Sequence, residues 1–156
     1  TLRIVEKLQP KYVIWENVKN LLSKKHRHNF DSYLEIMESI GYKNYYQVLN
    51  AKDYGIPQNR ERVFTISIRK DLNQSFEFPN KQELNLCLND MLEKDVSYKY
   101  FVSAEMINGM IKTHFNTYKL ENRLQDKNGL CKTILTSCSS RCPLLIKTNN
   151  IKYTYF

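Results

Sequence analysis

Apolar residues in the first forty positions follow a helical period, then a continuous run, then a helical period again. The first helix, predicted to end before Pro10, carries its apolar face on Leu2, Ile4, Val5 and Leu8. Residues 12–15 form a continuous apolar run, which predicts a short strand buried on both faces of a parallel sheet. Residues 29–40 favour a second helix, and Gly41 stands where a left-handed residue ends it.

Two segments of alternating pattern follow, at residues 45–49 and 62–68. The short connection between them carries Gly55 and Pro57, and such a connection favours an antiparallel pair over a second crossover through a helix. The order of helix, buried strand, helix and antiparallel pair predicts an α/β fold with this pair at the edge of the sheet.

The periodic spacing of apolar residues is less clear after Asp71. Helices are predicted at residues 88–93 and 103–115, and strands at residues 130–137 and 144–147. This change places a domain boundary near residue 71, and the chain shows no internal repeat.

The net charge indicates which partners suit the chain, and the positions of the glycines exclude a glycine-rich nucleotide loop within it. The net charge of +8 and isoelectric point near 9.3 suit a polyanionic partner such as nucleic acid, although basic enzymes of other classes share this balance. The four glycines, Gly41, Gly55, Gly109 and Gly129, stand singly, so this chain carries no glycine-rich nucleotide loop.

The chain gives no sign of a membrane protein. Its apolar runs stay well short of the roughly 18 residues of a membrane span, and its first residues do not resemble a signal peptide. We expect a soluble, cytoplasmic protein in which Thr1 is a cut rather than a natural start.

The first candidate for chemistry is the pair Glu16-Asn17, directly after the apolar run. In open α/β sheets, ligands bind in the crevice at the carboxyl ends of the strands, so a carboxylate there can point into a site. The pattern by itself leaves open a helix N-cap or a solvated loop carboxylate.

The second candidate is the segment 57–64, PQNRERVF. Strand alternation places Gln58, Arg60 and Arg62 on one face. Two guanidinium groups and an amide form a donor array suited to phosphate oxygens or base carbonyls. A solvated, charged strand face is the alternative.

Together these segments resemble the DNA (cytosine-5) methyltransferases. KYVIWENVKNL is similar to the family's motif with a Glu-Asn-Val core, and NAKDYGIPQNRERVF is similar to its Gln-x-Arg-x-Arg motif with the preceding Gly-x-Pro turn. The intervening helix of the IMESIGY type and the leading LRIVEKLQPK extend the resemblance over roughly residues 2–70. YFVSAEMI and LCKTILTS resemble more loosely the family's variable region of target recognition.

The resemblance implies a partial catalytic domain in residues 1–71, the second half of a Rossmann-like methyltransferase sheet with an antiparallel edge pair. It implies part of a smaller mixed α+β target-recognition region in residues 72–156, incomplete at the C-terminus. The implied reaction is methyl transfer from S-adenosylmethionine to C5 of cytosine in double-stranded DNA, in a restriction-modification system or a phage, with the target base flipped out of the duplex.

The resemblance also implies roles for single residues. A cysteine thiolate of the family attacks C6 of cytosine, and negative charge then builds toward N3. Glu16 matches the carboxyl group that hydrogen-bonds N3, where partial desolvation would keep it able to donate. Arg62 matches the arginine near O2 of the base, and Arg60 matches one that steadies the active-site loop or a phosphate. Gln58 is expected to support them, and Asn17 to orient the neighbouring loop.

The family's Pro-Cys nucleophile and glycine-rich cofactor loop have no match here. The cysteines, Cys87, Cys131, Cys138 and Cys142, do not follow a proline and lie on the wrong side of the Glu-Asn-Val motif. We therefore expect an interior piece of a methyltransferase, inactive alone, whose NNIKYTYF end departs from the family pattern. A non-catalytic DNA-binding remnant, or one half of a split enzyme completed by an upstream chain, are the alternatives.

The cysteines and the basic residues are the remaining candidates, for metal binding and DNA binding respectively. The spacings of Cys131, Cys138 and Cys142 are unlike the C-x2-C pairs of structural zinc sites, so we expect no metal. DNA contacts are expected from the basic residues Lys19, Lys24, Lys25, Arg27 and Arg60. A solvated basic loop explains most of the same residues equally well.

Overall fold

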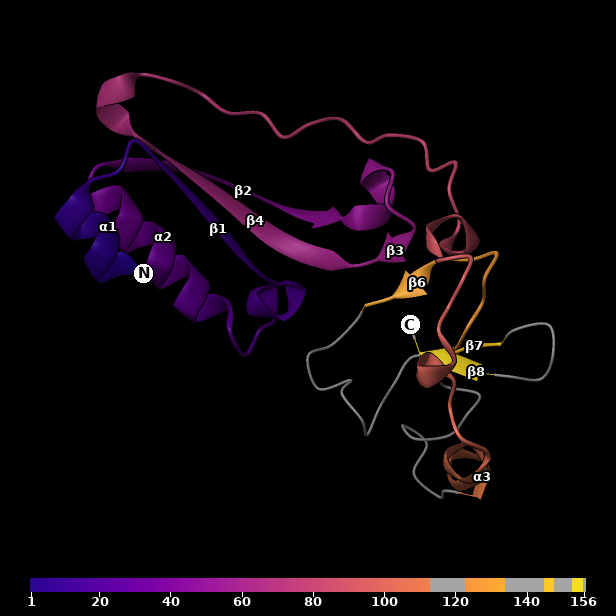
Figure 1. Cartoon of the computed structure of the whole chain (residues 1–156). Helices are drawn as coiled ribbons and strands as arrows, with labels where there is room; N and C mark the ends of the chain where they lie inside the picture. The colour runs from indigo at the N-terminus through magenta and orange to yellow at the C-terminus, as the bar shows by residue number, and fades with distance from the viewer. Residues whose placement is uncertain (113–122, 134–144, 148–152, 156) are drawn as a thin grey trace. The chain divides into compact units, whose positions relative to one another are not determined.

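The computed structural model describes residues 1–112, 123–133, 145–147 and 153–155 (Figure 1). The chain divides into two compact units, one made of residues 1–54 and 61–82 and the other of residues 55–60 and 83–156. The chain therefore passes more than once between the units.

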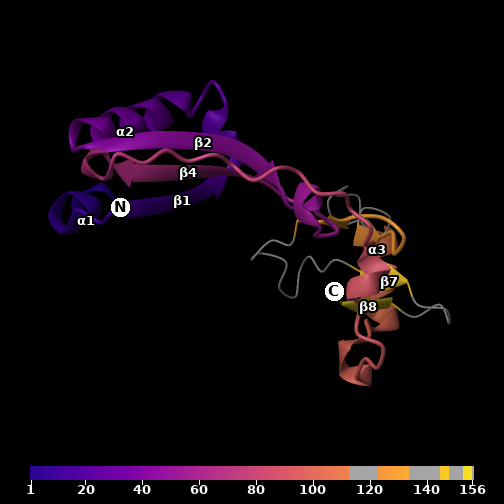
Figure 2. The same ribbon diagram turned by 90° about the horizontal axis from the view of Figure 1, so that it is seen from above.

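The first unit is a three-stranded antiparallel sheet with helices on one face (Figures 1 and 2). Its strands, β1 (Tyr12–Val18), β2 (Tyr42–Asn50) and β4 (Glu61–Arg69), lie in the order β1-β4-β2. The helices are α1 (Leu2–Leu8) and α2 (Arg27–Ser39), and 3-10 turns cover Lys19–Leu22, Ala51–Tyr54 and Lys70–Leu72.

The core of the first unit lies between the helices and the sheet. Its buried members are Val5, Phe30, Tyr33, Met37, Tyr42 and Val63, and Val13 and Trp15 of β1 pack against them. Aromatic rings dominate this contact, since the Trp15 ring lies 4.3 Å from that of Tyr33, between centroids. Burial of this apolar surface is the main force that holds α2 on the sheet.

The opposite face of the sheet is crossed by the segment 73–82, which has no regular secondary structure. The Phe76 ring makes an edge contact with Tyr45, and Tyr12 donates a hydrogen bond from its hydroxyl to Gln74. At its end, Lys81 forms an ion pair with Asp53, 2.8 Å long. These contacts make the segment part of the first unit.

Two helices and the antiparallel pair confirm the sequence pattern. α1 ends before Pro10, and Gly41 follows α2 with φ +97°. The strands expected at residues 45–49 and 62–68 are longer, as β2 and β4, and are antiparallel.

The expectation for residues 12–15 was wrong. β1 pairs antiparallel with β4, not in a parallel sheet, and its side chains alternate between half-buried and exposed, with Ile14 72% exposed. A continuous apolar run does not say which strands will flank it, and here β1 is an outer strand of its sheet. In α1, too, Ile4 and Leu8 are exposed and only Val5 is buried.

The second unit contains short strands. β3 (Gln58–Asn59) pairs in parallel with β6 (Cys131–Lys132), and β5 (Leu124–Gln125), β7 (Leu145–Lys147) and β8 (Tyr153–Tyr155) form a sheet in the order β5-β7-β8. Leu88, Cys131 and Ile146 form its buried cluster, with Leu92 packed against it.

The helices of this unit differ in part from the sequence pattern. The helix expected at residues 88–93 is a 3-10 turn, Leu88–Met91, and another 3-10 turn covers Tyr98–Tyr100. α3 (Ala104–Lys112) lies within the helix expected at 103–115, whose last residues fall outside the described ranges. β7 confirms the strand at 144–147, whereas residues 134–137 of the other expected strand are not described. Within the described ranges, no helix combines the length and apolar character needed to cross a membrane.

Candidate functional site

Glu16 and Arg62 meet on the face of the sheet opposite α2. Glu16 stands opposite Phe64 in the β1–β4 register, and side chains two residues apart in a strand share a face, so Arg62 is its diagonal neighbour. Arg62 Nε lies 2.9 Å from Glu16 Oε1. Arg62 also donates from Nη1 to the carbonyl oxygen of Glu61, at 2.8 Å. The guanidinium is thus held from two directions.

Accessibility differs between the two partners. The Arg62 side chain is 16% exposed, whereas that of Glu16 is 44% exposed. The expected desolvation of Glu16 is therefore slight in the described structure. The carboxylate is held by a cation and remains open to a ligand.

Asn17 points to the other face of β1, because neighbouring side chains alternate. Its Oδ1 accepts a hydrogen bond from the backbone N–H of Val18, 2.8 Å away. This local contact is at the point where β1 leads into the 3-10 turn Lys19–Leu22.

Lys19 has a partner that the sequence analysis missed. Its Nζ lies 2.8 and 2.9 Å from the two carboxylate oxygens of Glu61. Val18 pairs with Arg62, so one further step along the same register places Lys19 opposite Glu61. The pairing could have been found only by adding the strand register to the sequence.

Gln58 and Arg60 do not continue the β4 face, and the expectation of a single strand face with Arg62 was wrong. The strand is interrupted at Arg60, and Gln58 belongs to β3, which pairs with β6 in the second unit. Gln58 Nε2 donates to the carbonyl oxygen of Lys132 at 3.4 Å. Pairing with β6 competes with continuation of the β2–β4 ladder, which ends at the pair Asn50 and Glu61.

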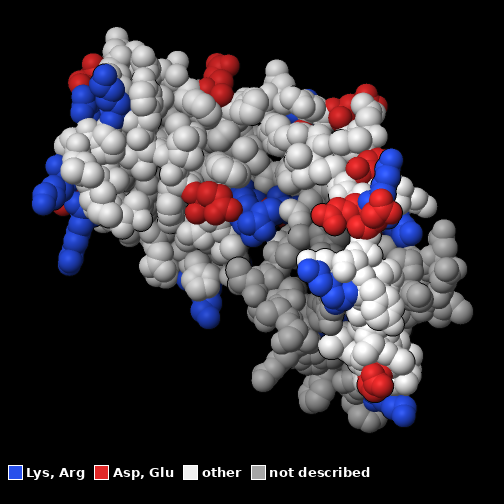
Figure 3. Space-filling view, in the orientation of Figure 1, with Lys and Arg blue, Asp and Glu red and all other residues white. Residues whose placement is uncertain are grey.

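Only some cations of the basic loop, residues 19–28, are free of the ion pairs that Lys19 and Arg27 form. Lys24 and Lys25 are exposed in the turn before α2. Arg27, by contrast, forms an ion pair with Asp31, 2.8 Å long, and donates to the hydroxyl of Tyr46. These hydrogen bonds raise the pKa of Arg27. Among the described residues on the face in Figure 3, basic and acidic side chains lie close together at several places.

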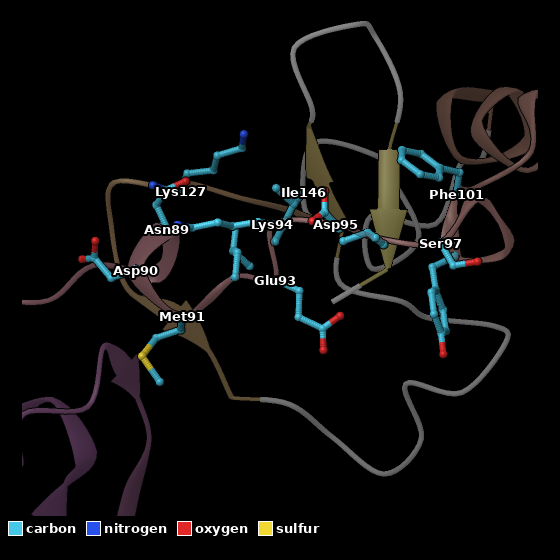
Figure 4. A pocket seen from close by; sticks show the side chains of 13 residues that line it. Asn89, Asp90, Met91, Glu93, Lys94, Asp95, Ser97, Phe101, Lys127 and Ile146 are labelled. Atoms are coloured by element: carbon cyan, nitrogen blue, oxygen red, sulfur yellow. The ribbon is translucent and has the colours of Figure 1, made fainter.

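A cavity of about 1330 Å³ lies in the second unit (Figure 4). Its lining includes residues 89–97, Lys127 and Ile146. The labelled side chains point in different directions instead of converging on one spot. Asp90, one of them, accepts a hydrogen bond from the backbone N–H of Cys87, which lowers the pKa of its carboxyl group and caps the 3-10 turn. The described side chains that line the cavity therefore do not converge as the polar groups of a binding site do.

Cys87 and Cys131 are free thiols, and Cys131 is buried. Burial raises the pKa of the Cys131 thiol, against the effect of Gln58 nearby. Cys138 and Cys142 lie outside the described residues. In the part of the chain that the structure covers, no three histidine, cysteine, aspartate or glutamate side chains gather as metal ligands.

Comparison with known sequences identifies a family. The family model for C-5 cytosine-specific DNA methylases matches residues 1–155. The Type II methyltransferase M2.ScrFI of Lactococcus lactis subsp. cremoris is 51% identical over 105 residues, which are 67% of this chain and 29% of that protein. M.HhaI of Haemophilus parahaemolyticus is 43% identical over 101 residues, 64% of this chain and 31% of that protein. The chain thus spans about three tenths of the length of these two curated relatives.

Solved structures show the same fold at low identity. A DNMT2 mutant of Spodoptera frugiperda superimposes with a TM-score of 0.69 at 16% identity, covering 99% of this chain and 55% of that one. The Dnmt2 methyltransferase of S. pombe gives 0.68 at 14% identity, with 99% and 54% covered. At these identities the likeness concerns the fold.

Proposed function

Because this chain belongs to the C-5 cytosine-specific DNA methylase family, we propose that it supplies part of the active site and part of the target-recognition region of a DNA (cytosine-5) methyltransferase. In this proposal, residues 1–71 are the second half of a Rossmann-like catalytic sheet, and residues 72–156 belong to target recognition. The single observation that carries the proposal is the contact between Glu16 and Arg62, which joins the two family motifs at 2.9 Å.

The chemistry of cytosine explains why these two side chains suit the reaction. Attack of a thiolate on C6 pushes negative charge toward N3 and O2 of the ring. A carboxyl group that donates at N3 and a guanidinium that donates at O2 both stabilise that charge. Glu16 and Arg62 supply one group of each kind, side by side, and the exposed Glu16 carboxylate can be reached by a flipped base.

The neighbouring polar residues take supporting roles in the proposal. Arg60 would steady the active-site loop or a phosphate, with Gln58 as a polar partner. Asn17 would hold the turn after β1, which its bond to the Val18 amide favours. Double-stranded DNA would be held by Lys24 and Lys25, which are exposed in the turn before α2. Lys19 is exposed too, but its ammonium group binds the Glu61 carboxylate.

S-adenosylmethionine is the methyl donor that the family implies, and it supplies an activated methyl group when bound. The residues described here do not form a cradle for it. Gly41 ends α2 and Gly55 lies in a turn, and the four glycines of the sequence stand singly. We therefore assign no residue of this chain to the cofactor.

The open edge of β1 supports a complementing methyltransferase segment as partner. The N–H of Arg69 bonds to the carbonyl of Lys11, so by alternation the peptide groups of Tyr12, Ile14, Glu16 and Val18 point away from β4. No strand among the described residues pairs with this edge. Ile14 is largely exposed beside it, and seven tenths of the M2.ScrFI relative has no counterpart in the alignment. A strand equivalent to one in that unaligned portion would cover the edge.

The test is reconstitution. The purified chain is mixed with the part of M2.ScrFI outside the 105 aligned residues, and transfer of a labelled methyl group to cytosine in duplex DNA is measured. We expect transfer by the mixture and none by this chain alone. Ile14→Lys, which places a charge beside the open edge, should abolish association.

Two results would contradict the proposal. Copurification of the two parts without methyl transfer would exclude the catalytic role of this chain. Methyl transfer by this chain alone would show that one of its own cysteines is the nucleophile. Salt-sensitive DNA binding without transfer would favour the second candidate, a non-catalytic DNA-binding remnant, for which the net charge of +8 is the supporting observation.

A further inference from the structure

Two ion pairs close the same end of the β1–β4 strand pair, one on each face. Lys19 binds both carboxylate oxygens of Glu61, and Arg62 binds Glu16. Glu16 and Lys19 belong to one stretch of chain, and Glu61 and Arg62 are neighbours in the other. The two ion pairs and the two backbones therefore form a closed ring.

The ring connects Lys19 to the guanidinium of Arg62. Arg62 Nη1 donates to the Glu61 carbonyl at 2.8 Å, while its Nε donates to Glu16. The Glu61 residue that presents this carbonyl is held at its own carboxylate by Lys19. We propose that Lys19 is a positioning residue, which acts through Glu61 to hold Arg62 in its orientation toward Glu16.

This assignment differs from a DNA contact by Lys19. The ammonium group already binds a carboxylate at two oxygens, so a phosphate would have to displace Glu61. The Lys19 and Glu61 side chains are 56% and 41% exposed, and exposed ion pairs have modest effects. We therefore expect changes of about two- to five-fold when the pair is broken.

The first test follows Arg62 in the 156-residue chain by nuclear magnetic resonance. Lys19→Met and Glu61→Gln should each speed exchange of the Arg62 Nε proton with water by about two- to five-fold. The charge swap Lys19→Glu with Glu61→Lys should return the rate toward that of the wild type. Lys7→Met, at an exposed lysine of α1, is the matched control and should leave the rate unchanged.

Folding is checked in every variant by the fluorescence of Trp15, the single tryptophan, which packs on Tyr33. An unchanged Arg62 exchange rate in both Lys19→Met and Glu61→Gln would overturn the proposal. So would a faster rate that the charge swap fails to reduce, because the effect would then not depend on the ion pair.

The second test rests on the proposed function and uses the reconstituted methyltransferase. Lys19→Met should lower kcat by about two- to five-fold with KM for DNA unchanged. A raised KM, with the salt dependence of binding reduced by about one unit of slope, would make Lys19 a phosphate contact and overturn the proposal. If the wild-type mixture does not methylate DNA, the proposed function fails, and the exchange measurement still decides the role of Lys19.

Discussion

Glu16 is placed by strand geometry beside a cation and at the open edge of its sheet. Its carboxylate is bound through one oxygen by Arg62 and is 44% exposed. In the proposed function, a flipped cytosine would meet a carboxyl group and a guanidinium that are already oriented together. Preorganised groups of this kind stabilise developing charge without having to reorient during the reaction.

The residue-scale prediction is that Glu16→Gln slows the chemical step and spares DNA binding. In the proposed role of Glu16, the amide would still hydrogen-bond at N3 but would not supply the proton that offsets charge formed by attack at C6. We expect a loss of about 10²- to 10⁴-fold in single-turnover methylation at saturating DNA, measured in the reconstituted enzyme.

Two other variants serve as comparisons for Glu16→Gln. Arg62→Ala should reduce both base placement and rate, since it removes the partner of Glu16 and, in the proposed function, the donor at O2 of the base. Lys25→Ala should only weaken DNA binding. A Glu16→Gln enzyme with the full rate, beside a Lys25→Ala enzyme without it, would make Glu16 a simple surface carboxylate.

At the scale of elements, the first unit is held at the junctions between its helices and strands. Gly41 ends α2 with φ +97°, and its carbonyl accepts a hydrogen bond from the N–H of Lys70 at 2.8 Å. The buried Tyr42 then donates to the carbonyl of Pro10 at 2.6 Å, which ties β2 to the end of the α1 segment. Each junction joins segments far apart in the sequence.

Two glycine substitutions should have opposite effects. Gly41→Ala forces a side chain into a positive-φ conformation and should lower the free energy of unfolding of the first unit by about 1 kcal/mol. Gly109→Ala lies within α3, where an added Cβ meets no atom within 4 Å, and should stabilise that helix by about 0.5–1 kcal/mol.

These effects are measured separately in urea. Trp15 fluorescence follows the first unit, and amide hydrogen exchange follows α3. Equal urea midpoints for the wild type and Gly41→Ala would show that the left-handed conformation is not required there.

The other element-scale prediction concerns acid. Arg69 donates to both oxygens of Asp71, at 2.7 and 3.0 Å, and to the carbonyl of Gln9 at 2.6 Å. The hydrogen bonds from Arg69 lower the pKa of Asp71. In acid the unfolded chain therefore binds a proton at Asp71 before the folded chain does. The stabilisation by this pair is complete above the ordinary aspartate pKa of about 3.9 and is lost as pH falls through the lowered value.

Asp71→Asn removes this contribution. The variant should be less stable than the wild type near neutral pH, and the difference should shrink from about pH 5 to about pH 2. Urea unfolding monitored by Trp15 fluorescence at several pH values measures it. A difference that stays constant over this range would mean that the charge of Asp71 does not stabilise the fold.

At the scale of the whole molecule, the excess of positive charge is partly neutralised by local ion pairs. Lys19 and Arg27 both bind carboxylates, whereas Lys24 and Lys25 stand exposed between them in the sequence. The number of basic residues therefore overstates the number of cations ready to meet phosphate. Binding to duplex DNA by the chain alone should be weak and governed by salt.

The whole-molecule prediction is that the affinity for duplex DNA falls steeply as salt rises. Replacing Lys24 and Lys25 together with Met should reduce the slope of log K against log salt by about two, whereas Lys7→Met should leave it nearly unchanged. Fluorescence anisotropy of labelled duplex DNA over a salt series gives these slopes. Affinity independent of salt would exclude phosphate contacts as the source of binding.

The sequence alone predicted the ends of α1 and α2, the antiparallel pair β2–β4 and the family. Pro10 and Gly41 mark the ends of α1 and α2 because their backbone preferences act within a few residues. The alternation in β2 and β4 predicted an antiparallel pair for the same reason, since a short connection permits little else. The motifs around Glu16 and Arg62 identified the family before any contact between these two residues was known.

Only the tertiary structure decided which strands and charges meet. The apolar run at Tyr12 predicted burial on both faces, but burial depends on neighbours far along the chain. Among the residues that the structure describes, β1 pairs with β4 and with no second strand. Strand alternation grouped Gln58 with Arg62, whereas pairing with β6 takes Gln58 into another sheet. In the sequence Lys19 has no evident partner. The β1–β4 register places it opposite Glu61, which binds it. Backbone preferences are local, whereas pairing and burial depend on distant segments of the chain, so the sequence pattern alone could not determine these contacts.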